Sequence, residues 1–151
     1  MISTEQIKEL RDRTGMSVMQ CKKALEEASG DMEKALILLR EAGVAVAAKK
    51  SDRALGAGLI ASYIHNTKQI GVIVELDCET DFVAKNEEFG KLAYDIAMQV
   101  AAANPTDVTG LLEQPFIKDS NLTIMAILQG ATQKFGEKIE IRRFSRYSTL
   151  D

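Results

Sequence analysis

The chain has 151 residues, of which 46% are hydrophobic and 27% are charged, a composition typical of a folded globular protein with a sizeable core. Its formal net charge of −3 provides no global field that would attract nucleic acid or an anionic membrane. No apolar run approaches the roughly 20 residues of a membrane-spanning helix. We therefore expect neither direct nucleic-acid binding nor membrane insertion.

The N-terminus and the few reactive side chains favour a reducing compartment. Residues 1–5 lack the basic and then apolar plan of a signal peptide. The two cysteines, Cys21 and Cys78, lie far apart with no metal-type spacing, and His65 is the sole histidine. We predict reduced thiols, a cytoplasmic location (or the interior of a bacterial-type organelle), and no cofactor or metal site.

Three helical patterns separated by breaks occupy residues 1–43. The first runs over 4–14 with Thr4 as its cap, the second starts at Ser17, and the third is capped by Asp31 and closed by Gly43. The short connections predict a compact three-helix module over 1–43. Residues 44–57 are expected to be a linker, and residues 58–151 a second domain.

The start of the second helix carries two adjacent apolar residues, Val18 and Met19. Adjacent positions on one helix cannot both point inward, although core packing is an alternative for either residue alone. Methionine adapts well to contact surfaces. Together with Arg11, at the end of the first helix, they predict a small apolar and cationic patch suited to a helix of another protein.

The linker contains a short basic cluster, Lys49, Lys50 and Arg53. Alanine and lysine favour helix there. The cluster is typical of a solvated helical linker. A phosphate-contacting patch is the alternative, without aromatic residues to support it.

Residues 58–151 mix strand and helix patterns. Apolar and β-branched residues predict strands over 58–65, 70–77 and 138–147, with a hairpin between the first two. Helical periodicity predicts helices over 87–103 and 122–135, ended by Pro105 and Gly136, whereas 105–121 is expected to be irregular with at most one helical turn. The order predicts an α+β fold, in which a small antiparallel three-stranded sheet carries helices on one face.

Residues 78–86 connect a strongly apolar strand to the clearest amphipathic helix. Thr80 can cap a helical turn that contains Asp81, Phe82 and Val83. An aromatic residue beside an acid is conspicuous in a chain with few aromatics. We interpret the turn as a rigid protrusion that wedges into a partner protein, with Phe82 pointing outward and Val83 anchoring it inside.

Two chemical alternatives apply to the same stretch. Cys78 could act as a nucleophile with His65 as its base, but a cysteine that follows a buried strand is usually inert packing. The acids Glu75, Asp77, Glu79 and Asp81 could bind a cation weakly, but their alternation on a strand and turn favours a solvated rim. Neither alternative is our main prediction, and the chain is not expected to be an enzyme.

Several long motifs resemble the elongation factor Ts family. Residues 80–86 (Thr-Asp-Phe-Val-Ala-Lys-Asn) resemble its signature, and residues 10–25 resemble its N-terminal ubiquitin-associated-like (UBA-like) helical module. Residues 47–50 resemble its linker, and residues 114–119 and 135–139, with 142–144, resemble its later motifs, all in the family's order. The chain departs from longer members in having one core half, and it is shorter than many short-form members between Pro105 and Leu111.

The resemblance implies a guanine-nucleotide exchange factor for elongation factor Tu in translation elongation. On this basis the N-terminal module grips the Tu GTPase domain, Asp81 and Phe82 press between helices beside the nucleotide site, and GDP is released. The alternative is a module that docks on Tu without efficient exchange. The implied partner contacts are Arg11, Val18, Met19, Thr80, Asp81, Phe82, Val83, Phe135 and Gly136.

A single core half leaves the edge of the sheet exposed. We predict a symmetric homodimer through the third strand, Ile139 to Tyr147, because a second copy would cover that edge.

Overall fold

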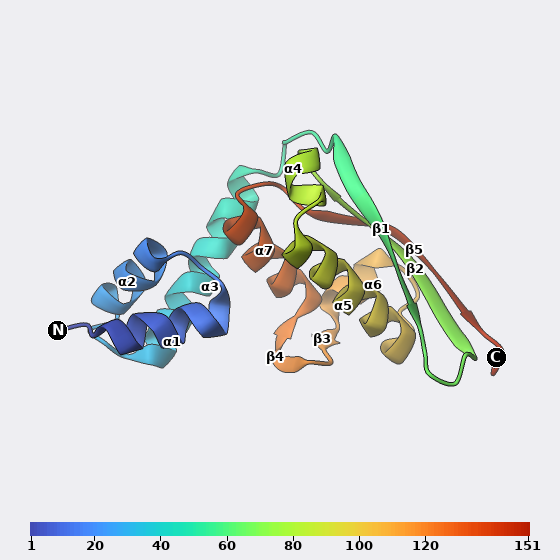
Figure 1. The fold of residues 1–151 in the computed structure, drawn as a ribbon, viewed down its shortest axis with the longest axis horizontal. Coiled ribbons are helices and arrows are strands. Elements are labelled where there is room, and N and C mark those ends of the chain that lie inside the picture. Colours follow the sequence, from blue (N-terminus) through green and yellow to red (C-terminus); the bar gives the residue numbers. More distant parts are fainter. The chain divides into compact units, whose positions relative to one another are not determined.

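The structure, a computed structural model, describes residues 1–151. It divides into two compact units (Figure 1). The first unit contains residues 1–51 and 129–136, and the second contains residues 52–128 and 137–151. No helix in the structure combines the length and the apolar character that crossing a bilayer requires.

Three N-terminal helices build most of the first unit: α1 (Thr4–Thr14), α2 (Val18–Glu27) and α3 (Met32–Lys49). Ser3 and Ser17 each form a capping box, and Asp31 caps α3. The predicted cap at Thr4 is therefore wrong by one residue. Gly15 adopts φ 71° after α1, a left-handed conformation that ends the helix at little cost for glycine.

The core of the first unit is formed by side chains that recur at helical spacing. Leu10, Cys21, Leu25 and Ala35 are fully buried, with Met16, Ala24, Ala28 and Leu39 beside them. Cys21, Leu25 and Ala28 follow one another at helical spacing in this core, whereas Val18 lies outside it.

Helix α3 does not end at Gly43, as the sequence predicted, but continues to Lys49. Gly43 is buried, and a Cβ at this position would lie 3.2 Å from the side-chain oxygen of Gln133 and 3.3 Å from the carbonyl oxygen of Gln129. The glycine therefore permits a close approach between α3 and the end of α7 (Ile124–Phe135). The alanines that follow it favour continued helix.

The second unit contains the predicted antiparallel sheet, with the strand order β1–β2–β5. The strands are β1 (Ala57–Ile64), β2 (Ile70–Cys78) and β5 (Glu140–Ser148). Helix α5 (Glu87–Ala103) packs against β1 and β2 (Figure 1). The α+β fold class, with a small antiparallel three-stranded sheet and helices packed on it, is confirmed.

The two faces of this sheet differ in burial. Val72, Val74 and Leu76 of β2 are buried, together with Phe89 and Ile96 of α5. The opposite face displays exposed apolar side chains from all three strands: Ile60, Ile64, Ile73 and Tyr147. This face therefore has no helical cover within the chain.

Residues 105–121 are more regular than predicted. They form α6 (Val108–Glu113), β3 (Pro115–Phe116) and the start of β4 (Asp119–Thr123), which pairs with β3. The buried amide of Gln99 on α5 holds this region, because it donates to the carbonyl of Pro115 (3.1 Å) and accepts from the N–H of Ile117 (2.8 Å). The sequence around Gln99 does not indicate that its amide binds the backbone of residues 115–117, because these residues belong to another segment.

Candidate functional site

A single helical turn, α4 (Asp81–Ala84), follows β2 and precedes α5 (Figure 1). Thr80 caps it, with its Oγ1 accepting from the N–H of Val83. The side chain of Phe82 is 85% exposed, whereas its neighbour Val83 is 5% exposed. Adjacent positions on a helical turn are about 100° apart around the axis, so Val83 can pack inward while Phe82 projects into solvent. Asp81, in the first turn, is also exposed.

A carboxylate from a distant part of the chain braces the turn. Glu137 accepts hydrogen bonds from the backbone N–H groups of Glu79 (3.0 Å) and Thr80 (2.9 Å), and from the Thr80 hydroxyl (2.6 Å). In return, Glu79 accepts from the N–H of Lys138 (2.6 Å) and from Arg53 (3.2 Å). Ion-assisted hydrogen bonds of this kind are the stronger ones in proteins. The entry to α4 is therefore fixed by tertiary contacts.

Cys78 lies behind the turn and is fully buried. Its thiol donates to the carbonyl oxygen of Thr80 at 3.3 Å. Burial raises the pKa of the Cys78 thiol, and the Glu137 carboxylate raises it further. A thiol with a raised pKa stays protonated near neutral pH, which makes it a poor nucleophile.

His65 cannot serve as a base for Cys78, because Cys78 pairs with Ala57 at one end of β1 and His65 follows the other end. Eight residues of strand separate Ala57 from His65, or roughly 25 Å at 3.3 Å per residue. His65 instead lies 3.1 Å from the hydroxyl of Tyr63. The thiol-enzyme alternative therefore has no geometric support.

The start of α2 presents a second exposed apolar feature. Val18 is 49% exposed and Met19 is 81% exposed, while Met16 is buried. The guanidinium of Arg11 donates to the carbonyl of Met16 at 3.3 Å, which holds its charge beside this end of α2. Arg11 therefore lies beside the segment that leads into α2, where Val18 and Met19 are exposed.

Phe135 and Gly136 lie at the end of α7. The ammonium of Lys134 lies 5.6 Å from the centre of the Phe135 ring, within cation–π range. Gly136 has φ 74° and donates its N–H to the carbonyl of Thr132. Both residues belong to the first unit with Arg11, Val18 and Met19, whereas Thr80 to Val83 belong to the second.

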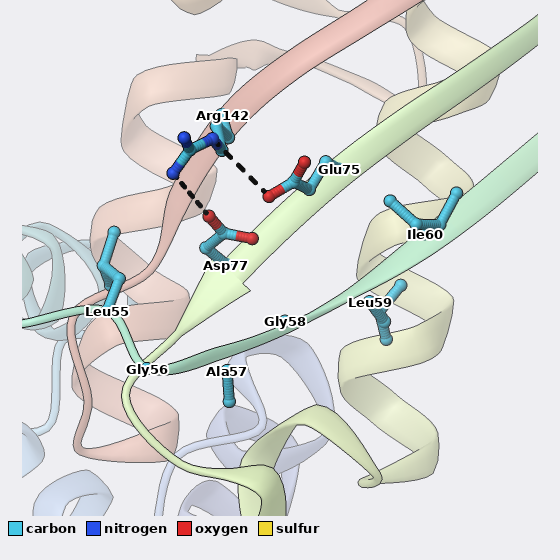
Figure 2. A pocket seen from close by; sticks show the side chains of 9 residues that line it. All are labelled: Leu55, Gly56, Ala57, Gly58, Leu59, Ile60, Glu75, Asp77 and Arg142. Carbon is cyan, nitrogen blue, oxygen red and sulfur yellow. Dashed lines mark ion pairs between the residues drawn. The ribbon is translucent and has the colours of Figure 1, made fainter.

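Glu75 and Asp77, which precede α4, pair with Arg142 of β5 beside a pocket of about 360 Å³ (Figure 2). Arg143 lies 2.8 Å from Glu75, and Arg142 lies 3.8 Å from Glu75 and 4.0 Å from Asp77. The register between β2 and β5 shifts here, so that Glu75 pairs with Arg143 and Leu76 with Ile141. Arg142 is the extra residue of this bulge, which lets two consecutive arginines reach the same carboxylate.

Burial raises the pKa of Asp77 to about 6, and the neighbouring carboxylate of Glu75 adds to the shift. The pKa of Glu75 is lowered, first by a hydrogen bond from Asp77 and then by Arg143. A Cβ on Gly58 would overlap the Asp77 carboxylate, so this acid packs directly against the β1 backbone. These acids are partnered within the sheet, in keeping with a structural role.

The fold and these surfaces define an α+β protein in which a helical unit and a sheet-based unit each display apolar side chains at a capped helix start. A family profile described as Elongation factor TS matches residues 79–151. Curated relatives named Elongation factor Ts match along almost the whole chain. That of Desulforamulus reducens is 44% identical over 97% of this chain and 88% of its own length. Those of Carboxydothermus hydrogenoformans and Moorella thermoacetica are 42% and 40% identical, over 97% of this chain and 88% and 95% of theirs.

The chain belongs to the elongation factor Ts family and is a translation elongation factor. The alignment with the Desulforamulus relative runs over 191 positions, although this chain has 151 residues. That relative therefore occupies at least 40 positions that this chain lacks.

Sequence reasoning missed Glu137 as a support for the turn. Its hydrogen-bonding partners lie 57 and 58 residues away in the chain, beyond the reach of any local pattern. An acid directly after a helix-ending glycine is a faint signal, because such a position gives no indication of which backbone it faces.

Proposed function

We propose that this chain is a guanine-nucleotide exchange factor that binds the GTPase domain of elongation factor Tu in the cytoplasm and promotes release of GDP. The observation that carries the proposal is the presentation of Phe82, 85% exposed on a turn whose entry is braced by Glu137. Membership of the elongation factor Ts family supports Tu as the partner.

The physical requirement is differential binding. An exchange factor makes no covalent bond; it binds the nucleotide-free partner more tightly than the loaded one. A rigid aromatic side chain supplies such a difference when it fits only after two helices of the partner have parted. A difference of roughly 4 kcal/mol would lower the affinity for GDP about a thousandfold.

The predicted contacts have distinct parts in this proposal. Arg11, Val18 and Met19 dock the first unit on a surface helix of the partner, while Asp81 and Phe82 disturb the nucleotide site. The ring of Phe135 and the backbone at Gly136 provide a further contact. Thr80 caps the turn and Val83 anchors it in the core. Both also border the surface that carries Asp81 and Phe82.

The test is release of a fluorescent GDP from cognate elongation factor Tu in the presence of excess unlabelled GDP. We expect the release rate to rise with the concentration of this chain and to saturate. Binding without acceleration at saturation would contradict the exchange activity. It would favour a second function, docking on Tu without exchange, which is suggested by the 40 or more positions that this chain lacks.

We also propose a symmetric homodimer through β5. This strand is at an edge of the sheet, and the outer face beside it carries the exposed side chains Ile73 and Tyr147. Pairing two β5 edges would satisfy their free backbone groups. Light scattering should give the mass of a dimer at micromolar concentrations; a monomer mass throughout that range would contradict the proposal.

A further inference from the structure

The turn that carries Phe82 packs against β1, β2 and α5, and the carboxylate of Glu137 joins its entry to the segment before β5. Its own sequence supplies a single helical turn, α4, and a helix this short has little stability of its own. Val83 anchors its inner side by apolar packing, which is non-directional and does not by itself set the orientation of the chain as it leaves β2. A further constraint is needed at the point where the chain leaves the strand.

Glu137 supplies that constraint by accepting three hydrogen bonds at once. One carboxylate oxygen accepts from the N–H groups of Glu79 and Thr80, at 3.0 and 2.9 Å. The other accepts from the hydroxyl of Thr80 at 2.6 Å. Three bonds to two consecutive residues fix both the position and the orientation of the chain before α4.

The same carboxylate sets the direction of the Thr80 cap. A threonine hydroxyl has one proton to donate, and here that proton is directed to Glu137. The oxygen lone pairs are then available to accept from the N–H of Val83, the bond that caps α4. Without Glu137 the hydroxyl could turn, and the cap would compete with water.

Glu137 is itself held in place. The next residue, Lys138, donates its N–H to the carboxylate of Glu79 at 2.6 Å, and Arg53 donates to the other oxygen of Glu79 at 3.2 Å. The segment before α4 and the segment before β5 therefore bind each other through reciprocal carboxylate-to-backbone bonds.

We infer that Glu137 is a positioning residue, which orients the α4 turn so that Phe82 meets elongation factor Tu in a fixed direction. The expected effect of Glu137 on Tu rests on the proposed exchange function. The expected effect of Glu137 on the α4 turn concerns the free protein alone. Glu137 acts through Thr80 and need not touch the partner.

The experiment compares the full chain with Glu137→Ala, Glu137→Gln and the control Glu113→Ala, an exposed acid on α6. Amide hydrogen exchange of the free proteins is measured first. We expect Glu137→Ala to accelerate exchange at Glu79 and Thr80 at least tenfold, with no change in the middle of β2. Glu137→Gln keeps an oxygen for the two backbone bonds, so most of the protection should remain. Unchanged protection in Glu137→Ala would overturn the inference.

GDP release from elongation factor Tu is measured second, over a range of concentrations. For Glu137→Ala we expect the maximal rate to fall about tenfold with less than a threefold change in the concentration for half-maximal effect, and Glu137→Gln should restore most of the rate. Glu113→Ala should match the unmodified chain. Lost protection with an unchanged maximal rate would overturn the positioning role. If the unmodified chain does not accelerate GDP release, the proposed exchange function is wrong. Amide hydrogen exchange in the free proteins still decides whether Glu137 holds the α4 turn.

Discussion

The turn at α4 and the start of α2 are two solutions to one problem, which is to display an apolar side chain without letting it collapse inward. At α2 the solution is local: Ser17 and Gln20 cap the helix across three residues, and Val18 and Met19 point away from the core. At α4 the solution is long-range, since Glu137 reaches back 57 residues to Thr80. The α2 surface should therefore behave as an independent docking patch, and the α4 turn as a part whose rigidity depends on the second unit.

The variant Phe82→Ala is the strongest test of the proposed difference between the α4 turn and the α2 surface. Aromatic side chains at the centre of an interface commonly contribute about 2 to 4 kcal/mol, so we expect the maximal rate of GDP release to fall on the order of a hundredfold. Because Phe82 is 85% exposed, the thermal midpoint should stay within about 2 °C of the unmodified chain. Large destabilisation would mean that the residue belongs to the core, and the wedge interpretation would fail.

Val83→Ala is the matched change on the inner side of the same turn. Val83 is buried, so removing two methyl groups should lower the free energy of unfolding by about 2 kcal/mol, measured by urea denaturation. The effect on GDP release should be smaller than that of Phe82→Ala once the folded fraction is matched. A stable but inactive variant would instead identify Val83 as a partner contact.

Met19→Ala tests the local patch. The side chain is 81% exposed, so we expect no measurable change in the unfolding transition. Its loss should weaken binding to elongation factor Tu by about 1 kcal/mol, or roughly fivefold in Kd, and leave the maximal exchange rate unchanged. Met19→Leu should retain most of the affinity. Equal losses in maximal rate for Met19→Ala and Phe82→Ala would remove the distinction between docking and wedging.

Asp77→Asn tests the strand that supports α4. The pKa of Asp77 is raised from 3.8 to about 6 in the folded chain, so the folded state binds more protons than the unfolded state between these values. The stability contributed by Asp77 is complete below about pH 4 and is lost as the pH rises through about 6. Glu75, whose pKa is lowered, acts in the opposite sense and loses its contribution as the pH falls.

The neutral asparagine should therefore be more stable than the unmodified chain by about 1 kcal/mol at pH 7.5, with the advantage vanishing near pH 4. Urea denaturation at the two pH values provides the measurement, and Asp95→Asn, whose carboxylate pairs with Lys118 on the surface, is the control. An advantage that did not depend on pH would show that the charge of Asp77 is not its cause.

Local chemistry predicted most of the architecture. The helix over 87–103 and the strands of the sheet follow from periodicities that need no knowledge of the rest of the chain, and the outward Phe82 follows from a threonine cap beside an inward valine. Resemblance named elongation factor Tu as the partner and added Phe135 and Gly136 to the contacts expected from local patterns, and all of these contacts remain predictions.

Two predictions from the sequence are wrong for the same physical reason. Gly43 was expected to end a helix, because isolated glycines often do, but here it permits close packing against Gln129 and Gln133. Residues 105–121 were expected to be irregular, because the buried Gln99 that organises them lies on another element. In both cases the deciding contact came from a segment distant in sequence.

The amino-acid sequence by itself determined most of the helices and the three strands of the main sheet, where the capped turn begins, and which family the chain resembles, because periodicity and capping depend on neighbours within four residues. Only the tertiary structure decided what holds the turn in place. The carboxylate of Glu137 and the backbone of Thr80 meet because β5 returns beside β2, and a hydrogen bond made by chain topology leaves no periodic trace in the sequence.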